Sequence, residues 1–469
     1  MPESTALTVA CHNGNLSAVR WCIRRGDPLE QRGYGGATPL VWAPQENFPE
    51  IVKILLKHGA KVGTAIEDGQ FPLYVACFRG HVAIARLLLD KGADVSQQSG
   101  DGFTALTIAS QHNQVDCARL LLDRDADVVR QRDHVALYIA SQRGFVALGR
   151  LLLDHGADLN QETHGSTPIH CACQFGHVAF VRLLVDQRRA DVNHARWRAG
   201  SGPLTIACRF GQLKVARLLL DRGIDIGEVE GGANGAFPLH AACLKDHDHL
   251  VRLLLDRGAD VEQRLADGGR SSLFVACQKS NVECVRLLLD RGADARQVMK
   301  AGGATALLAV CYLVGHVGCV LARLLLENGA DVEQADMYGT TPLYATSCKG
   351  SLDLAKLLLE SGADSERAHN SGLTPLQAAS ARGHGDVVVL LREYAATVTR
   401  GLEDEASRAP PELGGSVSAE RGSFSRRCAV FKRTCATCGE VAALSAPKLL
   451  RCADCHRDRY CTRAYQRAH

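Results

Sequence analysis

Aromatic residues are scarce in this 469-residue chain, of which Phe, Trp and Tyr make up only 5%. Hydrophobic residues nevertheless account for 46% of the chain, so Leu, Val and Ala supply most of its apolar surface. A core of small and aliphatic side chains favours packed helices. The length exceeds that of one ordinary compact domain, and the composition excludes a disordered or fibrous chain.

The chain also lacks recognisable targeting and membrane-spanning patterns. Its first residues, MPESTALTVACHNG, contain no basic region followed by an apolar run, so no secretory signal is expected. Residues 309–326 are apolar, but they include Gly315, His316 and Arg323 and fit the repeat described below better than a membrane span. Without an export signal, the odd number of 19 cysteines favours a reducing compartment with free or metal-bound thiols. We therefore expect an intracellular protein of the cytoplasm or nucleus, with no membrane attachment.

Sequence signatures of common enzyme classes are absent. The chain has no Gly-x-x-x-x-Gly-Lys-Ser/Thr phosphate loop, no Gly-x-Ser-x-Gly nucleophile turn and no His-Glu-x-x-His motif. Carboxylates are common, but they recur in register at the ends of Leu-rich segments, which indicates a repeated surface feature. We predict that the chain is not an enzyme.

One phrase, Arg-Leu-Leu-Leu-Asp/Glu-x-Gly-Ala-Asp, recurs along most of the chain. It occurs at residues 86–94, 150–158, 252–260, 286–294 and 323–331. The glycine position of the phrase recurs at intervals of 31 to 37 residues, most often 33. A period of this length indicates stacked structural units. We predict twelve units between residues 4 and 396.

Most units contain the same start and stop signals. A turn precedes a Thr-Pro-Leu helix start, as at residues 38–40, 341–343 and 374–376, where Thr caps the helix and Pro fits its first turn. The first helix stops near a Gly-His or Gly-Asn pair, and the second ends at the glycine of the repeated phrase. Two units depart from this pattern. The second has Pro44 and Pro49 where a helix should end, and the tenth is three residues longer, which predicts a bulged helix.

The period, the helix start and the helix end resemble the ankyrin repeat over residues 4–396. The resemblance implies an all-α repeat solenoid of helix pairs with projecting β-turn fingers. It further implies that a protein partner binds the concave side, which is built from the finger tips and the first helices. A monomer is the expected state of such a capped solenoid.

Seven of the 19 cysteines occupy one repeated position, four residues after the Leu or Ile that starts the first helix. Cys and Ser alternate there, and their shared small volume indicates a requirement for size rather than reactivity. A reactive thiol would need an activating His or cation, which a repeated core position does not offer. The position is filled by Cys11, Cys77, Cys173, Cys208, Cys243, Cys277 and Cys311, and elsewhere by Ser110, Ser141, Ser347, Ser380 and Pro44.

Composition changes beyond the repeats. The helical pattern fades near Arg400, and residues 397–427 are rich in Pro, Gly and Ser, which predicts a flexible linker. Residues 426–469 carry ten Lys or Arg against three Asp or Glu, so a basic tail follows a mildly acidic body. The predicted domains are the solenoid at 4–396, the linker at 397–427 and a small module at 428–469.

The small module contains two Cys-x-x-Cys pairs followed by a further cysteine. A Cys-x-x-Cys turn directs both sulfurs at one ion, and zinc takes four such ligands tetrahedrally at about 2.3 Å. So short a segment has little core, and bound metal would supply much of its folding energy. We therefore predict zinc as the cofactor, with Cys435, Cys438, Cys452, Cys455 and Cys461 as its ligands.

The order of these cysteines, together with Tyr460, resembles the MYND finger. That resemblance implies two zinc ions in interleaved sites and the docking of short proline-containing peptides. One expected ligand falls at Tyr465, and two more would lie beyond His469. We expect either a truncated sequence or a degenerate finger. A degenerate finger would gather the four paired cysteines on one zinc, with Cys461 or His456 as alternates.

Two interpretations of function remain open. In the first, the chain is an interaction scaffold whose solenoid binds one protein and whose finger recruits another. In the second, the basic tail binds nucleic acid, supported by Arg457, Arg459, Arg463 and Arg467, and the repeats bring regulators to it. The tail does not interleave aromatic with basic residues densely, which favours the scaffold. A ubiquitin-ligase role would need a complete cross-braced finger, and this one is incomplete.

Overall fold

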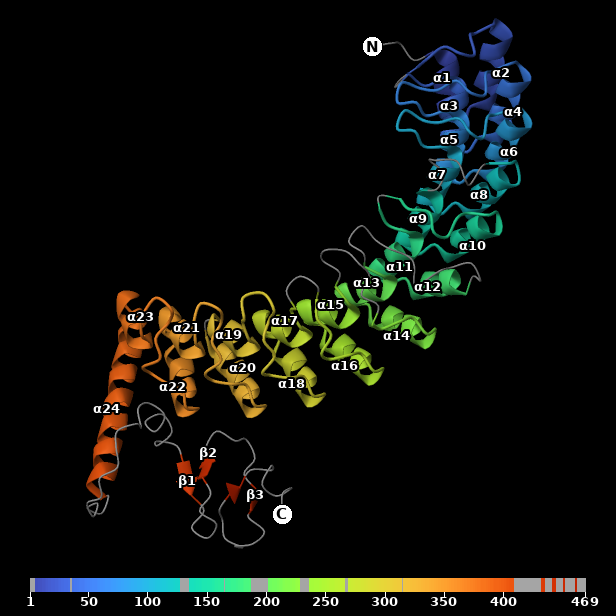
Figure 1. Cartoon of the computed structure of the whole chain (residues 1–469). Coiled ribbons are helices and arrows are strands. Elements are labelled where there is room, and N and C mark those ends of the chain that lie inside the picture. The colour runs from blue at the N-terminus through green and yellow to red at the C-terminus, as the bar shows by residue number, and fades with distance from the viewer. Residues whose placement is uncertain are drawn as a thin grey trace. The chain divides into compact units, whose positions relative to one another are not determined.

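A computed structural model describes residues 5–33, 36–126, 135–163, 165–186, 201–227, 236–265, 269–313 and 315–408, with four short strands beyond them. Its helices form twelve pairs, one for each predicted repeat (Figure 1). The chain divides into two compact units, residues 1–225 with 230–232, and residues 226–229 with 233–469. The predicted all-α repeat architecture is confirmed for the helix pairs.

In the first unit, the first helices of successive pairs pack side by side, and the second helices form a neighbouring layer. Each helix therefore contacts its own partner and the equivalent helices of adjacent pairs. The first helices are α1 (Ala6–His12), α3 (Pro39–Gln45), α5 (Pro72–Arg79), α7 (Ala105–Gln111), α9 (Val135–Arg143), α11 (Pro168–Phe175) and α13 (Pro203–Arg209). The second helices are α2 (Leu16–Arg25), α4 (Pro49–Lys57), α6 (Val82–Asp90), α8 (Val115–Leu122), α10 (Val146–Asp154), α12 (Val178–Val185) and α14 (Leu213–Asp221).

The second unit repeats this two-layer arrangement. Its first helices are α15 (Pro238–Leu244), α17 (Ser272–Gln278), α19 (Ala306–Cys311), α21 (Pro342–Lys349) and α23 (Pro375–Ala381). Its second helices are α16 (Asp248–Asp256), α18 (Val282–Asp290), α20 (His316–Glu327), α22 (Leu352–Glu360) and α24 (Gly385–Arg408).

The first helices start and stop as the sequence predicts. The side-chain oxygens of Thr104, Thr305 and Thr341 each accept the backbone N–H three residues further on. Proline lies in the first turn of α3, α5, α11, α13, α15, α21 and α23. Gly80, with φ +78°, ends α5 in the left-handed conformation that a glycine adopts without strain.

Both irregular repeats still form a helix pair. Pro44 is buried inside α3, and Pro49 occupies the first position of α4, where its missing N–H costs no hydrogen bond. The prediction of a bulged helix in the tenth repeat is wrong. α20 spans 12 residues, whereas α6 and α22 span 9 each, so the additional residues extend an ordinary helix.

The last helix continues past the expected end of the repeats. α24 reaches Arg408, because Leu402, Glu403, Glu405 and Ala406 are all strong helix formers. Its final residues thus lie in the segment predicted as a linker, and residues 409–431 lie outside the described part. Among the described residues, no helix is both long enough and apolar enough to cross a membrane.

The core lies between the two helix layers. In α6, Ile84, Ala85 and Leu88 are completely buried, because the helix packs against α5 of its own pair and against α4 and α8 of the neighbouring pairs. Burying one such aliphatic side chain contributes about 1.5–3 kcal/mol. The adjacent repeats therefore enclose this second helix.

The repeated cysteine position faces this core. All seven cysteines there are 0% exposed, as are the serines at positions 110, 141 and 347. Burial raises the pKa of the Cys11 and Cys311 thiols to about 12, so both stay neutral at physiological pH. Ser380 of α23 is exposed, since no further first helix follows it in the described residues. The position therefore selects a small side chain that the next repeat covers.

Side chains at the start of the second helices donate hydrogen bonds to the preceding repeat. Gln212 Nε2 donates to the carbonyl oxygen of Gln174 at 3.1 Å. A Cβ on Gly176 would lie 2.2 Å from Gln212 Oε1, so the glycine that ends α11 leaves room for this contact. Equivalent contacts join Gln114 to Phe78, His177 to Gln142, Asn281 to Cys243 and His384 to Cys348.

Ion pairs join the outer ends of neighbouring second helices. The carboxylate that follows Leu-Leu-Leu or Leu-Leu-Val in one repeat pairs with an arginine of the next repeat, which lies one residue after the equivalent Asp. Arg124 Nη2 lies 2.7 Å from Asp90 Oδ1, Arg291 Nη2 lies 2.7 Å from Asp256 Oδ1, and Arg222 pairs with Asp186. The recurring carboxylates thus link repeats at the surface, at about 0–1 kcal/mol for each pair.

Four short strands lie in the C-terminal segment. β1 (Lys432–Thr434) pairs with β2 (Val441–Ala443) in antiparallel fashion, with Thr434 opposite Val441. β3 (Leu450–Arg451) pairs in the same way with β4 (Tyr460–Cys461), with Leu450 opposite Cys461.

Replacing Gln212 by Ala should lower the local stability of its repeat by about 1 kcal/mol, because the Gln174 carbonyl loses its partner. Gln212→Glu should cost more, since a carboxylate would face that carbonyl and cannot donate to it. Hydrogen exchange of α11 and α14 measures both effects. Ser351→Ala is the matched control at the same repeat position, where no side-chain hydrogen bond caps the helix. Equal exchange in all three variants would contradict this role.

Candidate functional site

Finger-like turns join one helix pair to the next. In the turn at residues 331–341, the Asp336 amide donates to the Thr340 carbonyl at 3.2 Å and closes the loop. The Asp336 carboxylate accepts from the amides of Tyr338 at 2.9 Å and Thr340 at 2.8 Å. Asp commonly stabilises turns by bonding the backbone that follows it. This finger is therefore held by its own sequence.

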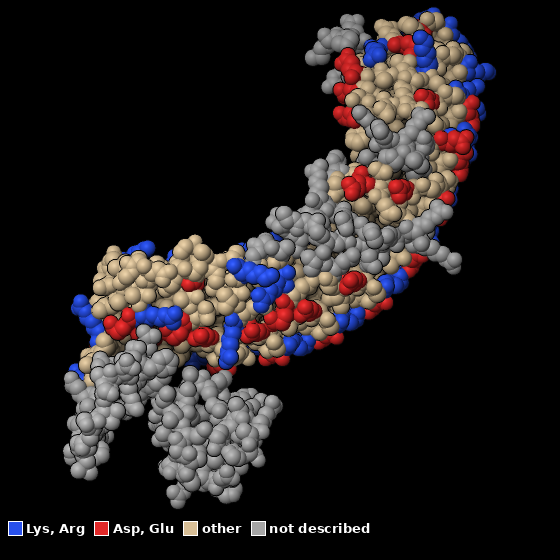
Figure 2. All heavy atoms as spheres, viewed as in Figure 1, with Lys and Arg blue, Asp and Glu red and all other residues tan. Residues whose placement is uncertain are grey.

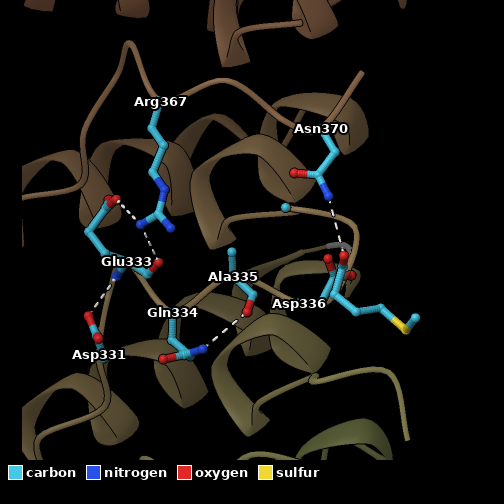
Figure 3. A pocket seen from close by; sticks show the side chains of 9 residues that line it. Asp331, Glu333, Gln334, Ala335, Asp336, Arg367 and Asn370 are labelled. Atoms are coloured by element: carbon cyan, nitrogen blue, oxygen red, sulfur yellow. Dashed lines mark hydrogen bonds and ion pairs between the residues drawn. The ribbon is translucent and has the colours of Figure 1, made fainter. Parts of the chain in front are cut away.

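Adjacent fingers are also bonded to one another. The Met337 amide donates to Gly302 O at 3.0 Å, and the Asn370 amide donates to Tyr338 O at 3.2 Å. Asn370 Nδ2 donates in addition to Met337 O at 3.2 Å (Figure 3). Gly339 has φ +76°, and a Cβ there would lie 2.3 Å from Asn370 Oδ1, so this close approach requires glycine. Three consecutive fingers thus form one hydrogen-bonded row.

A shallow cleft of about 470 Å³ lies between the fingers at 331–341 and 364–374. At its base, the Glu333 carboxylate accepts from Arg367 Nη1 at 2.9 Å (Figure 3). It also accepts from the Asp364 amide at 2.9 Å. Arg367 also donates to the Glu333 carbonyl at 2.8 Å. The cleft is lined by Asp331, Glu333, Gln334, Ala335, Asp336, Met337, Gly339, Arg367 and Asn370.

Large apolar side chains stand exposed beside this polar cleft. Met337 is 63% exposed and Tyr338 is 60% exposed, both at the finger tip. The Tyr344 ring stacks on His369, with ring centres 4.7 Å apart and an angle of 11° between the planes. Tyr312, at the end of α19, is 45% exposed. We call Tyr312, Met337, Tyr338, Tyr344 and His369 the finger surface.

The finger surface has the chemistry of a binding site. Burial, and to a smaller extent the Asp336 carboxylate, raise the pKa of Tyr312, so its phenol remains a hydrogen-bond donor at physiological pH. Lys349 Nζ lies 5.8 Å from the centre of the Tyr312 ring. Tyrosine and methionine are enriched where proteins bind proteins. Rigid hydrogen-bonded loops that display these side chains can engage an apolar partner with little loss of conformational entropy.

The resemblance implied a partner at the finger tips and first helices, but sequence reasoning did not identify the residues of the finger surface. Exposed residues follow no repeat period, so the pattern that located the core could not locate them. A signal was present, however: in a chain with only nine tyrosines, three lie between residues 312 and 344.

The side chains of the predicted zinc ligands all lie outside the part of the chain that the structure describes. Cys435, Cys438, Cys452 and Cys455 lie outside the described part, and only the backbone of Cys461 is described, in β4. The first Cys-x-x-Cys pair falls between β1 and β2, and the second falls between β3 and β4. In the part of the chain that the structure describes, no three His, Cys, Asp or Glu side chains gather as a possible metal site.

Comparisons with known proteins bear on the repeats. The family model for ankyrin repeats (3 copies) matches residues 2–66, 61–133, 124–196, 204–299, 291–369 and 307–401. Protein phosphatase 1 regulatory subunit 27 of Mus musculus is 39% identical over 67 residues, which are 14% of this chain and 44% of that protein. Its Homo sapiens counterpart is 37% identical over 67 residues, with the same coverage of 14% and 44%.

The chain therefore spans less than half the length of these curated relatives. Among solved structures, the ankyrin repeat domain of Bcl-3, a member of the IkappaB protein family, is 31% identical, with a TM-score of 0.43. That match covers 49% of this chain and 100% of the Bcl-3 chain.

Proposed function

Because this chain belongs to the ankyrin-repeat family, we propose that it is a protein-binding scaffold whose partner docks on the finger surface. The observation that carries this proposal is the exposure of Met337 and Tyr338, 63% and 60%, on loops held by hydrogen bonds. Large exposed apolar groups on a rigid support commonly mark interaction sites. Binding, rather than catalysis, is the proposed activity.

The arrangement suits an interface with an apolar centre and a polar rim. A partner that covers Met337 and Tyr338 removes their side chains from water, which supplies the main favourable free energy. The neighbouring cleft offers Asp336 and Asn370 at its rim for hydrogen bonds that orient the partner. The loop hydrogen bonds are already formed, so little further ordering is required on binding.

The comparisons support the repeat more than any particular partner. The two relatives are named as regulatory subunits of protein phosphatase 1, but the likeness is confined to 67 residues. That length corresponds to about two repeats of the period found here. The proposal therefore specifies a protein partner with an exposed apolar segment and does not extend to a phosphatase.

Truncating the two finger-tip side chains tests the proposal. The double variant Met337→Ala/Tyr338→Ala should weaken partner capture by the full chain about tenfold or more. Truncating one hot-spot side chain costs roughly 1–2 kcal/mol or more of binding free energy. Quantitative mass spectrometry of proteins retained by the immobilised chain, at several chain concentrations, gives the affinity ratio. The fold should persist, because both side chains are exposed.

The matched control removes similar apolar surface elsewhere. Val317→Ala/Leu352→Ala truncates residues that are 41% and 40% exposed on α20 and α22. This variant should retain every partner that the unmodified chain retains. Partners that are kept by the finger-tip variant, or lost equally from both, would place the docking site elsewhere.

We further propose that the C-terminal segment binds zinc through Cys435, Cys438, Cys452 and Cys455, with Cys461 or His456 as alternates. The double Cys-x-x-Cys spacing supports this, since it offers four thiolates, the ligand set of a structural zinc site. The sequence position of each pair, between two strands that pair in antiparallel fashion, also supports it. Zinc, when bound, would cross-link the two hairpins into a module that could recruit a second protein.

Zinc content tests this second proposal. Native mass spectrometry of the purified full chain should show one zinc ion that chelation removes. Cys435→Ser/Cys438→Ser should abolish it, whereas Cys428→Ser, outside both pairs, should not. A chain without zinc under reducing conditions would contradict the assignment. Two zinc ions per chain would show that further groups act as ligands and would contradict the single-site arrangement.

A further inference from the structure

The outer surface of the first two repeats departs from the ion-pair pattern of the others. In α6 and the second helices that follow it, the residue after Leu-Leu-Leu, or at the equivalent position, is Asp or Glu, as at Asp90. α2 has Arg24 at this position and α4 has Lys57. Lys61 likewise replaces the Asp that ends the Gly-Ala-Asp phrase, such as Asp94. The charge at these positions is therefore reversed in two adjacent repeats.

This reversal leaves an excess of cations. Residues 16–27 and 49–61 contain six Lys or Arg side chains but only two carboxylates, Asp27 and Glu50. Asp27 is occupied by Arg25, whose Nε and Nη2 donate to its two oxygens at 2.8 Å each. The other cations are exposed, and their side chains form no ion pair with a described carboxylate. Glu30, which accepts the Lys61 backbone amide at 2.8 Å, is the carboxylate beside Lys61. We call these residues the N-terminal basic face: Arg20, Arg24, Lys53, Lys57 and Lys61.

Figure 2 shows Lys and Arg side chains gathered over the part of the first unit where α2 and α4 lie in Figure 1. Over the later repeats of the unit, blue and red side chains alternate. The basic face is therefore local to the first two repeats.

An uncovered tryptophan lies within the basic face. Trp21 is 57% exposed, whereas the equivalent leucines range from buried, as at positions 120 and 287 with 5% each, to half-buried, as at positions 87 and 253. The Arg25 guanidinium lies 4.5 Å from the Trp21 ring centre and is itself fixed by Asp27. The ring is thus held on one side and remains open on the other. Tryptophan in such a setting is the residue type most often found to anchor a protein interface.

The spacing of the cations determines which arrangement of negative charges on a ligand can bind the basic face. Arg20 and Arg24 are one helical turn apart on α2, as are Lys53 and Lys57 on α4, so each pair is separated by about 6 Å along its axis. The two helices pack against each other, and packed helices lie about 8–10 Å apart. Carboxylates four residues apart on an incoming segment would match each row of cations.

We propose that the N-terminal basic face binds an acidic segment of a partner protein, with an apolar side chain of that segment covering Trp21. This is a second interface, independent of the finger surface. Charge complementarity sets the orientation and the association rate, and Trp21 supplies the apolar anchor.

Other anionic partners fit the surface less well. A membrane would favour several interfacial aromatic or aliphatic side chains, and Trp21 is the one exposed aromatic residue of α2 and α4. Nucleic acid would favour an extended basic track, whereas Asp90 and Asp186 pair with arginines on the later repeats of the same unit. A short acidic peptide matches the small area of the basic face.

Lysine footprinting of the full chain tests the proposal locally, so that binding by the basic C-terminal tail does not obscure it. The probe is a random copolymer of glutamate and tyrosine, with polyglutamate as the apolar-free comparison. The copolymer should slow acetylation of Lys53, Lys57 and Lys61 about fivefold or more and leave Lys214 on α14 nearly unchanged. Trp21→Leu should reduce the protection by the copolymer without affecting that by polyglutamate.

Charge reversal supplies the decisive comparison. Arg20→Glu/Arg24→Glu should abolish the protection of the three lysines, and it is tolerated by the fold because both side chains are exposed. Arg86→Glu/Arg119→Glu makes the same charge change on α6 and α8 and should leave the protection intact. Persistence of protection in the first variant, or its loss in both, would overturn the proposal. Stronger protection by phosphatidylserine vesicles or by duplex DNA than by the copolymer would overturn the assignment to an acidic protein.

Discussion

The enclosure of internal second helices, such as α6, between neighbouring helix pairs is the interaction on which the rest of the structure depends. Ile84 and Leu88 of α6 are completely buried only because the adjacent repeats cover them. A single helix pair would leave such residues in water, so stability arises from the interfaces between repeats. Hydrogen bonds such as that from Gln212 to the Gln174 carbonyl reinforce the same interfaces. The buried and hydrogen-bonding positions that recur from repeat to repeat therefore stabilise the stacking of neighbouring helix pairs.

Function is then carried by residues that depart from the repeat. Met337 and Tyr338 occupy a finger whose backbone is fixed by Asp336 and Asn370, so their identity affects the surface and not the stack. Arg24 and Lys57 likewise occupy positions that are acidic in later repeats, without changing the helices that bear them. The stack thus allows two different surfaces, one apolar and one basic, to be built on the same repeated unit.

Much of the fold could be predicted because the relevant residues recur in register. The period, the Thr and Pro helix starts and the buried cysteine position follow from side-chain size and backbone conformation, which are local properties. The expected bulge in the tenth repeat was wrong, since a helix accommodates added residues at its start as α20 does. The inter-repeat donors escaped notice because Gln212, His177 and Asn281 share a position but not a residue type.

The candidate sites were less accessible to sequence reasoning. The exposure of Met337 depends on how the chain turns, and no periodicity encodes it. The basic residue Arg24 marks a departure from the repeat because the structure shows Asp90, at the equivalent position, as an ion-pair partner. The zinc ligands are defined by spacing alone and remain a prediction. A photo-crosslinking residue at position 338, in place of Tyr338, tests the central claim most directly. We expect a covalent adduct with a partner protein from position 338 and none from position 352 on α22. Adducts from position 352 alone, or equally from both, would contradict it.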